Sequence, residues 1–166
     1  MSSKRGRATA GTPALRALHA AGVEHTLRPY EHDPRTELSY GAEAAAALGV
    51  EPDRVLKTLL AEVDGALVVA VLPVAGRLDL KALAAAVGGK RAALAERAAA
   101  ERATGYVIGG ISPLGQRQQL PTVVDDDALR HTTVLVSAGR RGLDVELAPA
   151  DMVALTSART APVTRR

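Results

Sequence analysis

The sequence predicts a single α+β domain in which hairpins are mixed with short helices. Two pairs of apolar segments are each joined by a turn of glycine and polar residues, Asp64-Gly65 in the first pair and 139–142 in the second, as expected for antiparallel strands. Hairpins mixed with helices favour this class over a doubly wound βαβ sheet. A chain of 166 residues fits one domain with its own core.

The first third of the chain predicts helix, strand and helix. Thr12 followed by Pro13 is typical of an N-cap and first helical position, and Gly22 ends that helix. Residues 25–31 resemble a short strand that ends near Tyr30, and a turn follows. An alanine-rich helix is expected over 39–48, closed by a glycine.

The middle of the chain predicts a hairpin followed by two helices. Residues 55–63 and 66–72 form the hairpin, and the second strand is apolar on both faces, so we expect it to be central in the sheet. Helices are expected over 79–87 and 95–103. A short strand at 106–108 leads into a glycine-rich loop.

The last third predicts mainly strands. Residues 121–124 form one strand, and 132–137 pairs with 143–147 in the second hairpin. A short helix over 149–155 and a further strand in the tail complete the chain.

Composition restricts both the core and the chemistry. The chain has no Phe, no Trp and three Tyr, so the core must be aliphatic. The absence of Cys excludes a disulfide, a thiolate zinc site and a cysteine nucleophile on the protein. No apolar run approaches the roughly 20 residues that span a bilayer, and residues 1–11 form a basic tail that we expect to be disordered. A cytoplasmic protein is expected, and a net charge of +3 permits a polyanionic partner.

Lys57 is the most informative single residue. It shares one face of its predicted strand with Leu59, Ala61 and Val63, and a buried ammonium requires a counter-ion or a ligand. The alternative is a lysine at the end of a strand whose amino group reaches water.

The loop 109–115, Gly-Gly-Ile-Ser-Pro-Leu-Gly, is the second candidate. Paired glycines allow the backbone to approach a ligand and leave N–H groups free to face an anion, such as the oxyanion of an ester under attack. The alternative is an ordinary turn. The loop lacks the Gly-Lys-Ser/Thr ending of a phosphate-binding P-loop.

Ser112 is not expected to be a hydrolase nucleophile. A nucleophile elbow uses the N–H of the following residue as an oxyanion donor, and here that residue is Pro113, which has none. We expect Ser112 to bind substrate or to shape the loop.

Asp144 lies between apolar residues in its predicted strand and shares a face with Glu146. It is either part of a solvated acidic face or a carboxylate that orients Lys57 or binds a substrate amine.

Other charged residues have simpler explanations. The four His residues show no metal-ligand spacing, and Asp125-Asp126-Asp127 stands where a strand passes into a helix, so helix capping explains it and no metal site is expected. Arg117, Arg140 and Arg141 are candidates for weak contacts with tRNA phosphates, with surface solvation as the alternative.

Taken in order over residues 12–160, several motifs resemble the YbaK family of aminoacyl-tRNA deacylases, relatives of the editing insertion of bacterial prolyl-tRNA synthetases. The matching segments are Tyr30-Glu31-His32-Asp33-Pro34, Lys57-Thr58-Leu59, 73–76 with 78–81, Thr104-Gly105-Tyr106, 109–116, 120–122 and 141–147.

This resemblance implies a domain over 12–166 with a mixed, mainly antiparallel sheet that curls toward a barrel and is flanked by helices. It implies that Lys57 and Gly109 are catalytic. It also implies a set of residues that bind the substrate: Tyr30, Thr58, Gly110, Ile111, Ser112, Pro113 and Asp144.

The family resemblance also implies a substrate and a mechanism. Cysteine on proline-accepting tRNA, and on its own tRNA, is the expected substrate, with the thiol of the substrate as nucleophile, a thiolactone as product and no cofactor. A tethered thiol has a high effective concentration, which suits a chain without an obvious nucleophile. Aminoacyl-tRNA is the expected partner, together with prolyl-tRNA synthetase. The alternatives are a deacylase for alanine or another small residue, and a non-catalytic module that binds tRNA or another ligand.

Overall fold

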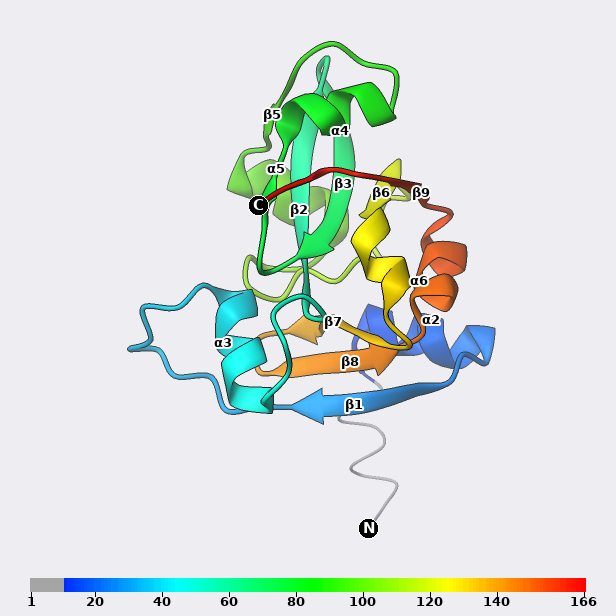
Figure 1. The fold of residues 1–166 in the computed structure, drawn as a ribbon. Coiled ribbons are helices and arrows are strands. Elements are labelled where there is room, and N and C mark those ends of the chain that lie inside the picture. Colours follow the sequence, from blue (N-terminus) through cyan, green and yellow to red (C-terminus); the bar gives the residue numbers. More distant parts are fainter. Residues whose placement is uncertain (1–10) are drawn as a thin grey trace.

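The computed structural model describes residues 11–166 and confirms the α+β class (Figure 1). The basic tail predicted for 1–11 lies outside the described residues, apart from Gly11. The helices of the described part are α2 (Pro13–Ala21), α3 (Tyr40–Leu48), α4 (Leu80–Ala86), α5 (Arg97–Thr104), α6 (Pro149–Thr156) and the 3₁₀ helix η1 (Asp126–Arg130). The strands are β1 (His25–Pro29), β2 (Leu56–Val63), β3 (Ala66–Pro73), β4 (Arg77–Leu78), β5 (Ala92–Leu94), β6 (Thr122–Asp125), β7 (Val134–Arg140), β8 (Leu143–Leu147), β9 (Arg159–Ala161) and β10 (Thr164–Arg165).

The strands form three sheets, and the curling toward a barrel that we expected does not reach closure. The main sheet has the order β5-β2-β3-β6-β9, a second has the order β1-β8-β7, and β10 pairs with β4. Pairing is antiparallel except for β3 with β6 and β6 with β9. A single bridge between Val55 and Leu135 joins the main sheet to the second, and Figure 1 shows β2 and β3 rising from that junction.

Local sequence signals explain where the helices and the first hairpin begin and end. The side chains of Thr12, Ser39 and Asp79 each accept a hydrogen bond from a backbone N–H of the helix that they precede. Asp64 and Gly65 both have positive φ, 50° and 85°, which is the geometry of a tight turn between two twisted strands. The capping role expected at the acidic triplet is also found, since Asp125 accepts from the N–H of Asp127.

Two differences from the sequence prediction concern short segments. Residues 106–108 do not form a strand; the buried Tyr106 hydroxyl instead donates to the Leu114 carbonyl at 2.6 Å, which turns the chain into the glycine-rich loop. Strands β4 and β5 were not expected, because two or three residues are too few to show an alternating pattern.

The core is aliphatic, as composition requires, and β3 passes through its centre. From Val68 to Pro73 every residue of β3 is buried, and the strand is central in its sheet, as predicted, between β2 and β6. Val69 and Val71 pack with α2 and the second sheet, whereas Ala70 and Leu72 pack with α4. Helices of the described part are too short or too polar to cross a membrane.

Candidate active site

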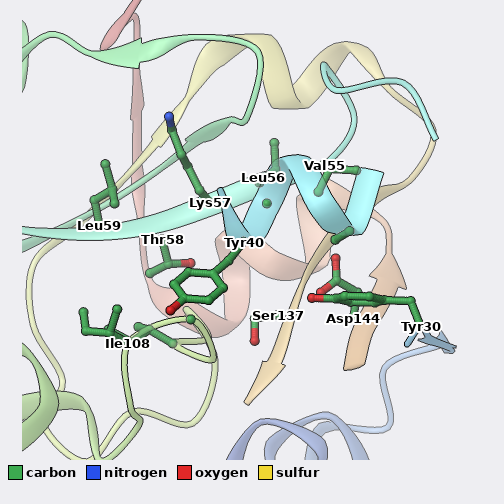
Figure 2. Close-up of a pocket in the computed structure, with 14 residues that line it drawn as sticks. Tyr30, Tyr40, Val55, Leu56, Lys57, Thr58, Leu59, Ile108, Ser137 and Asp144 are labelled. Carbon is green, nitrogen blue, oxygen red and sulfur yellow. The ribbon is translucent and has the colours of Figure 1, made fainter. Parts of the chain in front are cut away.

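A cavity of about 150 Å³ lies where the start of β2 meets α3, the glycine-rich loop and the β7–β8 hairpin (Figure 2). Its walls include six residues that the sequence predicted for the site, and they come from four separate segments of the chain. These residues are Tyr30, Lys57, Thr58, Gly109, Ile111 and Asp144.

Thr58 presents free backbone groups to this cavity. β2 pairs with β3 along its whole length, but β5 covers the other edge only at Ala61–Val63. Backbone groups alternate between the two edges of an antiparallel strand. The Leu60 carbonyl accepts from Ala95 on the β5 side, so the N–H and C=O of Thr58, two residues earlier, face the same edge. Neither group has a hydrogen-bond partner among residues 11–166, so the cavity wall contains a backbone donor and a backbone acceptor.

Lys57 is half-buried, and its amino group is held by the main chain. Nζ donates to the Gly76 carbonyl, in the turn between β3 and β4, at 2.7 Å. Burial, and next the charge of Arg77, hold the pKa of Lys57 below its usual range. Figure 2 shows the amino group directed away from Asp144, and the described residues contain no ion pair between the two. Asp144 therefore does not orient Lys57, and its other predicted role, binding a substrate amine, stays a prediction.

Asp144 is a buried carboxyl in the middle of β8. It lies opposite Arg28 of β1 and Ser137 of β7, and its exposed fraction is 5%. Burial raises the pKa of Asp144 to about 7, and the charge of Arg28 opposes that shift. Figure 2 shows the carboxyl beside Tyr30, whose pKa is raised, chiefly by burial, so that its phenol is neutral near pH 7. The cavity therefore has a carboxyl that can gain or lose its charge near neutral pH.

Gly109 brings its backbone to the cavity with φ of 91°. This left-handed φ favours glycine, and a Cβ at this position would also force the Arg141 side chain to shift and would lie 3.0 Å from the Tyr40 ring. The N–H groups of Gly109 and Ile111 have no partner within the described part of the chain, so they are free to donate hydrogen bonds to an anion. The N–H of Gly110, in contrast, closes a turn with the Val107 carbonyl at 2.9 Å.

Three residues predicted to bind substrate lie outside the cavity: Gly110, Ser112 and Pro113. Gly110 packs against the Arg140 backbone, where a Cβ would come within 2.7 Å of its Cα. Ser112 is fully buried, and its hydroxyl accepts from the Leu114 N–H at 3.2 Å. Pro113 lines a separate crevice behind the loop. Their contacts shape the loop, which is the second of the two roles expected for Ser112.

The three candidate phosphate-binding arginines have different surroundings. Arg141 donates to the Ile108 carbonyl at 2.9 Å and stacks on the Tyr40 ring, 4.6 Å from its centroid, at the cavity. Arg140 is exposed at the end of β7. Arg117 is exposed beside Gly105, at the end of α5.

Sequence reasoning missed two polar residues of the cavity wall, Tyr40 and Ser137. Ser137 could have been found, because the register of the predicted 132–147 hairpin places it opposite Asp144. Tyr40 carries a weaker signal, a single aromatic residue at the start of an alanine-rich helix.

Residues 37–155, which form most of the chain and supply nearly all of the cavity wall, match the model of the aminoacyl-tRNA editing domain. The chain belongs to this family. A relative from Enterococcus faecalis (strain ATCC 700802 / V583), named as a candidate Cys-tRNA(Pro)/Cys-tRNA(Cys) deacylase, EbsC, is 40% identical over 156 residues, which cover 93% of this chain and 94% of the relative.

Solved structures have the same fold as this editing domain. A candidate trans-editing enzyme for prolyl-tRNA synthetase is 25% identical, with a TM-score of 0.77, over 99% of this chain and 98% of that one. A hypothetical protein, APE2540, is 29% identical, with a TM-score of 0.81, over 92% of this chain and 99% of that one.

The editing-domain cavity suits the polarisation of a carbonyl better than direct nucleophilic attack by the protein. The described residues that line it supply hydroxyl groups from Tyr30, Tyr40, Thr58 and Ser137 and a carboxyl from Asp144, but no histidine to complete a catalytic triad. Thr58, Gly109 and Ile111, which line it, have backbone N–H groups without a partner in the described chain, and Lys57 lines it with an amino group that the Gly76 carbonyl holds. This arrangement can orient an ester and stabilise an oxyanion.

Proposed function

We propose that this editing domain acts in trans to remove cysteine from tRNA(Pro), and also from Cys-tRNA(Cys). The observation that carries the proposal is the match, over nearly the full length of both chains, to a relative named for that deacylation. The cavity supports it, because its size suits a small aminoacyl group.

The thiol of the substrate is the proposed nucleophile. Its sulfur attacks the ester carbonyl carbon, a C–S bond forms, and the C–O bond to the terminal ribose breaks. The thiol proton passes to the ribose oxygen, so the products are a cysteine thiolactone and tRNA with a free 3′ end. Because the thiol is already tethered to the carbonyl, its effective concentration is high and the protein needs only to orient the ester.

Each polar group of the cavity has a proposed task. The N–H groups of Gly109 and Thr58 stabilise the oxyanion, and Lys57 supplies a positive charge close to it. The Asp144 carboxylate receives the α-amino group of the aminoacyl ester, with Tyr30 beside it. Ile111 contributes to the apolar part of the wall, since it lines the same space.

A panel of charged tRNAs tests the substrate. Cys, Ala and Pro are each attached to tRNA(Pro), Cys also to tRNA(Cys), and loss of the ester is followed with and without prolyl-tRNA synthetase, the proposed partner. We expect Cys to be lost fastest from either tRNA. Fastest loss of Ala would assign the domain to the alternative class of deacylases.

A Lys57→Ala variant tests whether this cavity catalyses the reaction. We expect kcat/KM for Cys-tRNA(Pro) to fall about 100-fold or more, since loss of one group that stabilises an oxyanion has that effect in other enzymes. Lys81→Ala, which changes an exposed lysine of α4, is the matched control. Equal slow rates for the wild type and Lys57→Ala would favour a non-catalytic module that binds tRNA or another ligand.

A further inference from the structure

The carbonyl that holds Lys57 belongs to a residue that must be glycine because of its neighbours. Gly76 is buried, and its backbone is not in the left-handed region, so its φ does not require glycine. A Cβ on Gly76 would overlap Cγ2 of Thr164 and lie 3.3 Å from the Arg165 carbonyl oxygen. The segment Val163–Arg165 therefore lies directly against the back of Gly76.

This segment is itself firmly anchored. β10 pairs with β4, with Thr164 opposite Leu78, and the Val163 carbonyl accepts from the Asp79 N–H at 2.8 Å. The Val163 N–H donates to Asp125 Oδ2 at 2.9 Å, and the Thr164 hydroxyl donates to the same oxygen. Asp125 is 2% exposed at the end of β6, so a buried carboxylate of the main sheet fixes β10. Figure 1 shows the C-terminal segment, in red, crossing in front of β2 and β3.

These contacts form one continuous path from Asp125 through Thr164 and Gly76 to Lys57. A lysine side chain has four flexible carbons and many rotamers, and a single fixed acceptor selects one of them. The acceptor here is the main-chain carbonyl of a residue that packs directly against β10.

We propose that β10 is a positioning element for the proposed reaction, in which Thr164 fixes the Gly76 carbonyl and thereby the amino group of Lys57. This proposal rests on the proposed function only in assigning Lys57 to deacylation. Thr164 and Gly76 are positioning residues, because neither lines the cavity.

Gly76→Ala and its partner substitution Thr164→Ser test this path. The added methyl group in Gly76→Ala must displace Thr164 or the Gly76 carbonyl, and we expect kcat for Cys-tRNA(Pro) to fall about tenfold or more, with KM changed little, because small misplacements at a reacting centre are costly. Thr164→Ser removes Cγ2 but keeps the hydroxyl that donates to Asp125. The double variant is therefore expected to recover most of the kcat lost in Gly76→Ala.

Gly89→Ala is the matched control. It also lacks a left-handed φ, and its added Cβ would overlap Val63 Cγ1 at the far end of β2. We expect it to lower Tm about as much as Gly76→Ala but to keep the kcat of the wild type. Equal losses of kcat in the two variants, or no recovery in the double variant, would overturn the proposal.

A spectroscopic measurement separates this proposal from the proposed function. The chain has four lysines, so the ¹³Cε resonance of Lys57 can be assigned by comparison with Lys57→Ala. In Gly76→Ala we expect the pKa of Lys57 to rise toward its ordinary value as the amino group moves to water. In the double variant, we expect Thr164→Ser to reverse that rise. An unchanged titration of Lys57 in Gly76→Ala would refute the positioning role whether or not the wild type deacylates Cys-tRNA. Absence of deacylation in the wild type, with the titration shifted as expected, would refute only the proposed function.

Discussion

At the scale of single residues, Asp144 shows how function and stability oppose each other in this domain. A carboxyl that is 5% exposed and lacks an ion pair within the described residues loses hydration when it ionises, and burial accordingly raises its pKa to about 7. An aspartate on the surface would keep its hydration when ionised and would not destabilise the fold, but it would lie outside the cavity. The buried position gives the carboxylate access to a small substrate, and it makes the folded protein less stable once the carboxyl is charged.

Asp144→Asn tests whether the charged carboxylate makes the folded protein less stable. The pKa of Asp144 is higher in the folded state than in the unfolded state, so the folded state retains a proton between about pH 4 and pH 7 that the unfolded state releases. Wild-type stability therefore falls as pH rises through this window, by at most about 1.4 kcal/mol per pH unit. Asn lacks the ionisation, so Tm of the variant minus Tm of the wild type should increase by several degrees from pH 5 to pH 8. A difference in Tm that stays constant over this range would contradict a buried carboxyl with a raised pKa.

At the scale of elements, the glycine-rich loop is held by residues from outside it. Arg141 of the β7–β8 turn binds the Ile108 carbonyl and stacks on Tyr40 of α3, so three segments meet over Gly109. Behind the loop, Tyr106 binds Leu114. The free N–H groups of the loop are therefore fixed in direction without using hydrogen bonds of their own.

Arg141→Ala should loosen the loop. The stacked and hydrogen-bonded guanidinium is exposed, so its loss is worth about 0.5–1 kcal/mol. Hydrogen exchange at Gly110, whose N–H donates to the Val107 carbonyl, should become about two to five times faster. Arg141→Lys should restore little, because an ammonium lacks the planar group that stacks on Tyr40. Arg140→Ala changes an exposed neighbour on the same turn and serves as the control. Equal exchange rates in Arg141→Ala, Arg141→Lys and Arg140→Ala would show that Arg141 does not hold the loop.

Sequence patterns predicted elements well where local chemistry decides them. Capped helices such as α2 and α3 and the hairpin at Asp64-Gly65 follow from short-range signals. β4 and β5 were missed because their pairing depends on distant partners, β10 and β2. The same limit applies to the site: Lys57 and Gly109 stood out by residue type and surroundings, but only the tertiary structure separates Gly109, which faces the cavity, from Gly110, which packs against Arg140.

At the scale of the whole molecule, a net charge of +3 is a modest attraction for a polyanion. Exposed arginines such as Arg117 and Arg140 form no ion pair within the described part of the chain, so they are available for phosphates. Binding of tRNA should therefore depend on salt, with the affinity falling linearly with salt concentration on logarithmic axes.

Charge-removing variants test that dependence. Arg117→Gln and Arg140→Gln should each weaken binding of tRNA(Pro) and reduce the slope of the salt plot by about 0.7 to 1 if the residue contacts a phosphate. Arg159→Gln, an exposed arginine on the edge strand β9, is the control and should leave the slope unchanged. A slope that is the same in all three variants would mean that these arginines serve only as a solvated surface.

The unpaired edge of β2 also bears on the solubility of the folded protein. A free strand edge normally exposes a template to which another chain can add, and proteins tend to cover or charge such edges to avoid aggregation. Thr58, where the edge is open, instead lines a cavity of about 150 Å³ bordered by α3 and the glycine-rich loop. A whole strand cannot enter that space, whereas a single aminoacyl group can. At this position the unpaired backbone groups are therefore better placed to bind a small ligand than to add a strand.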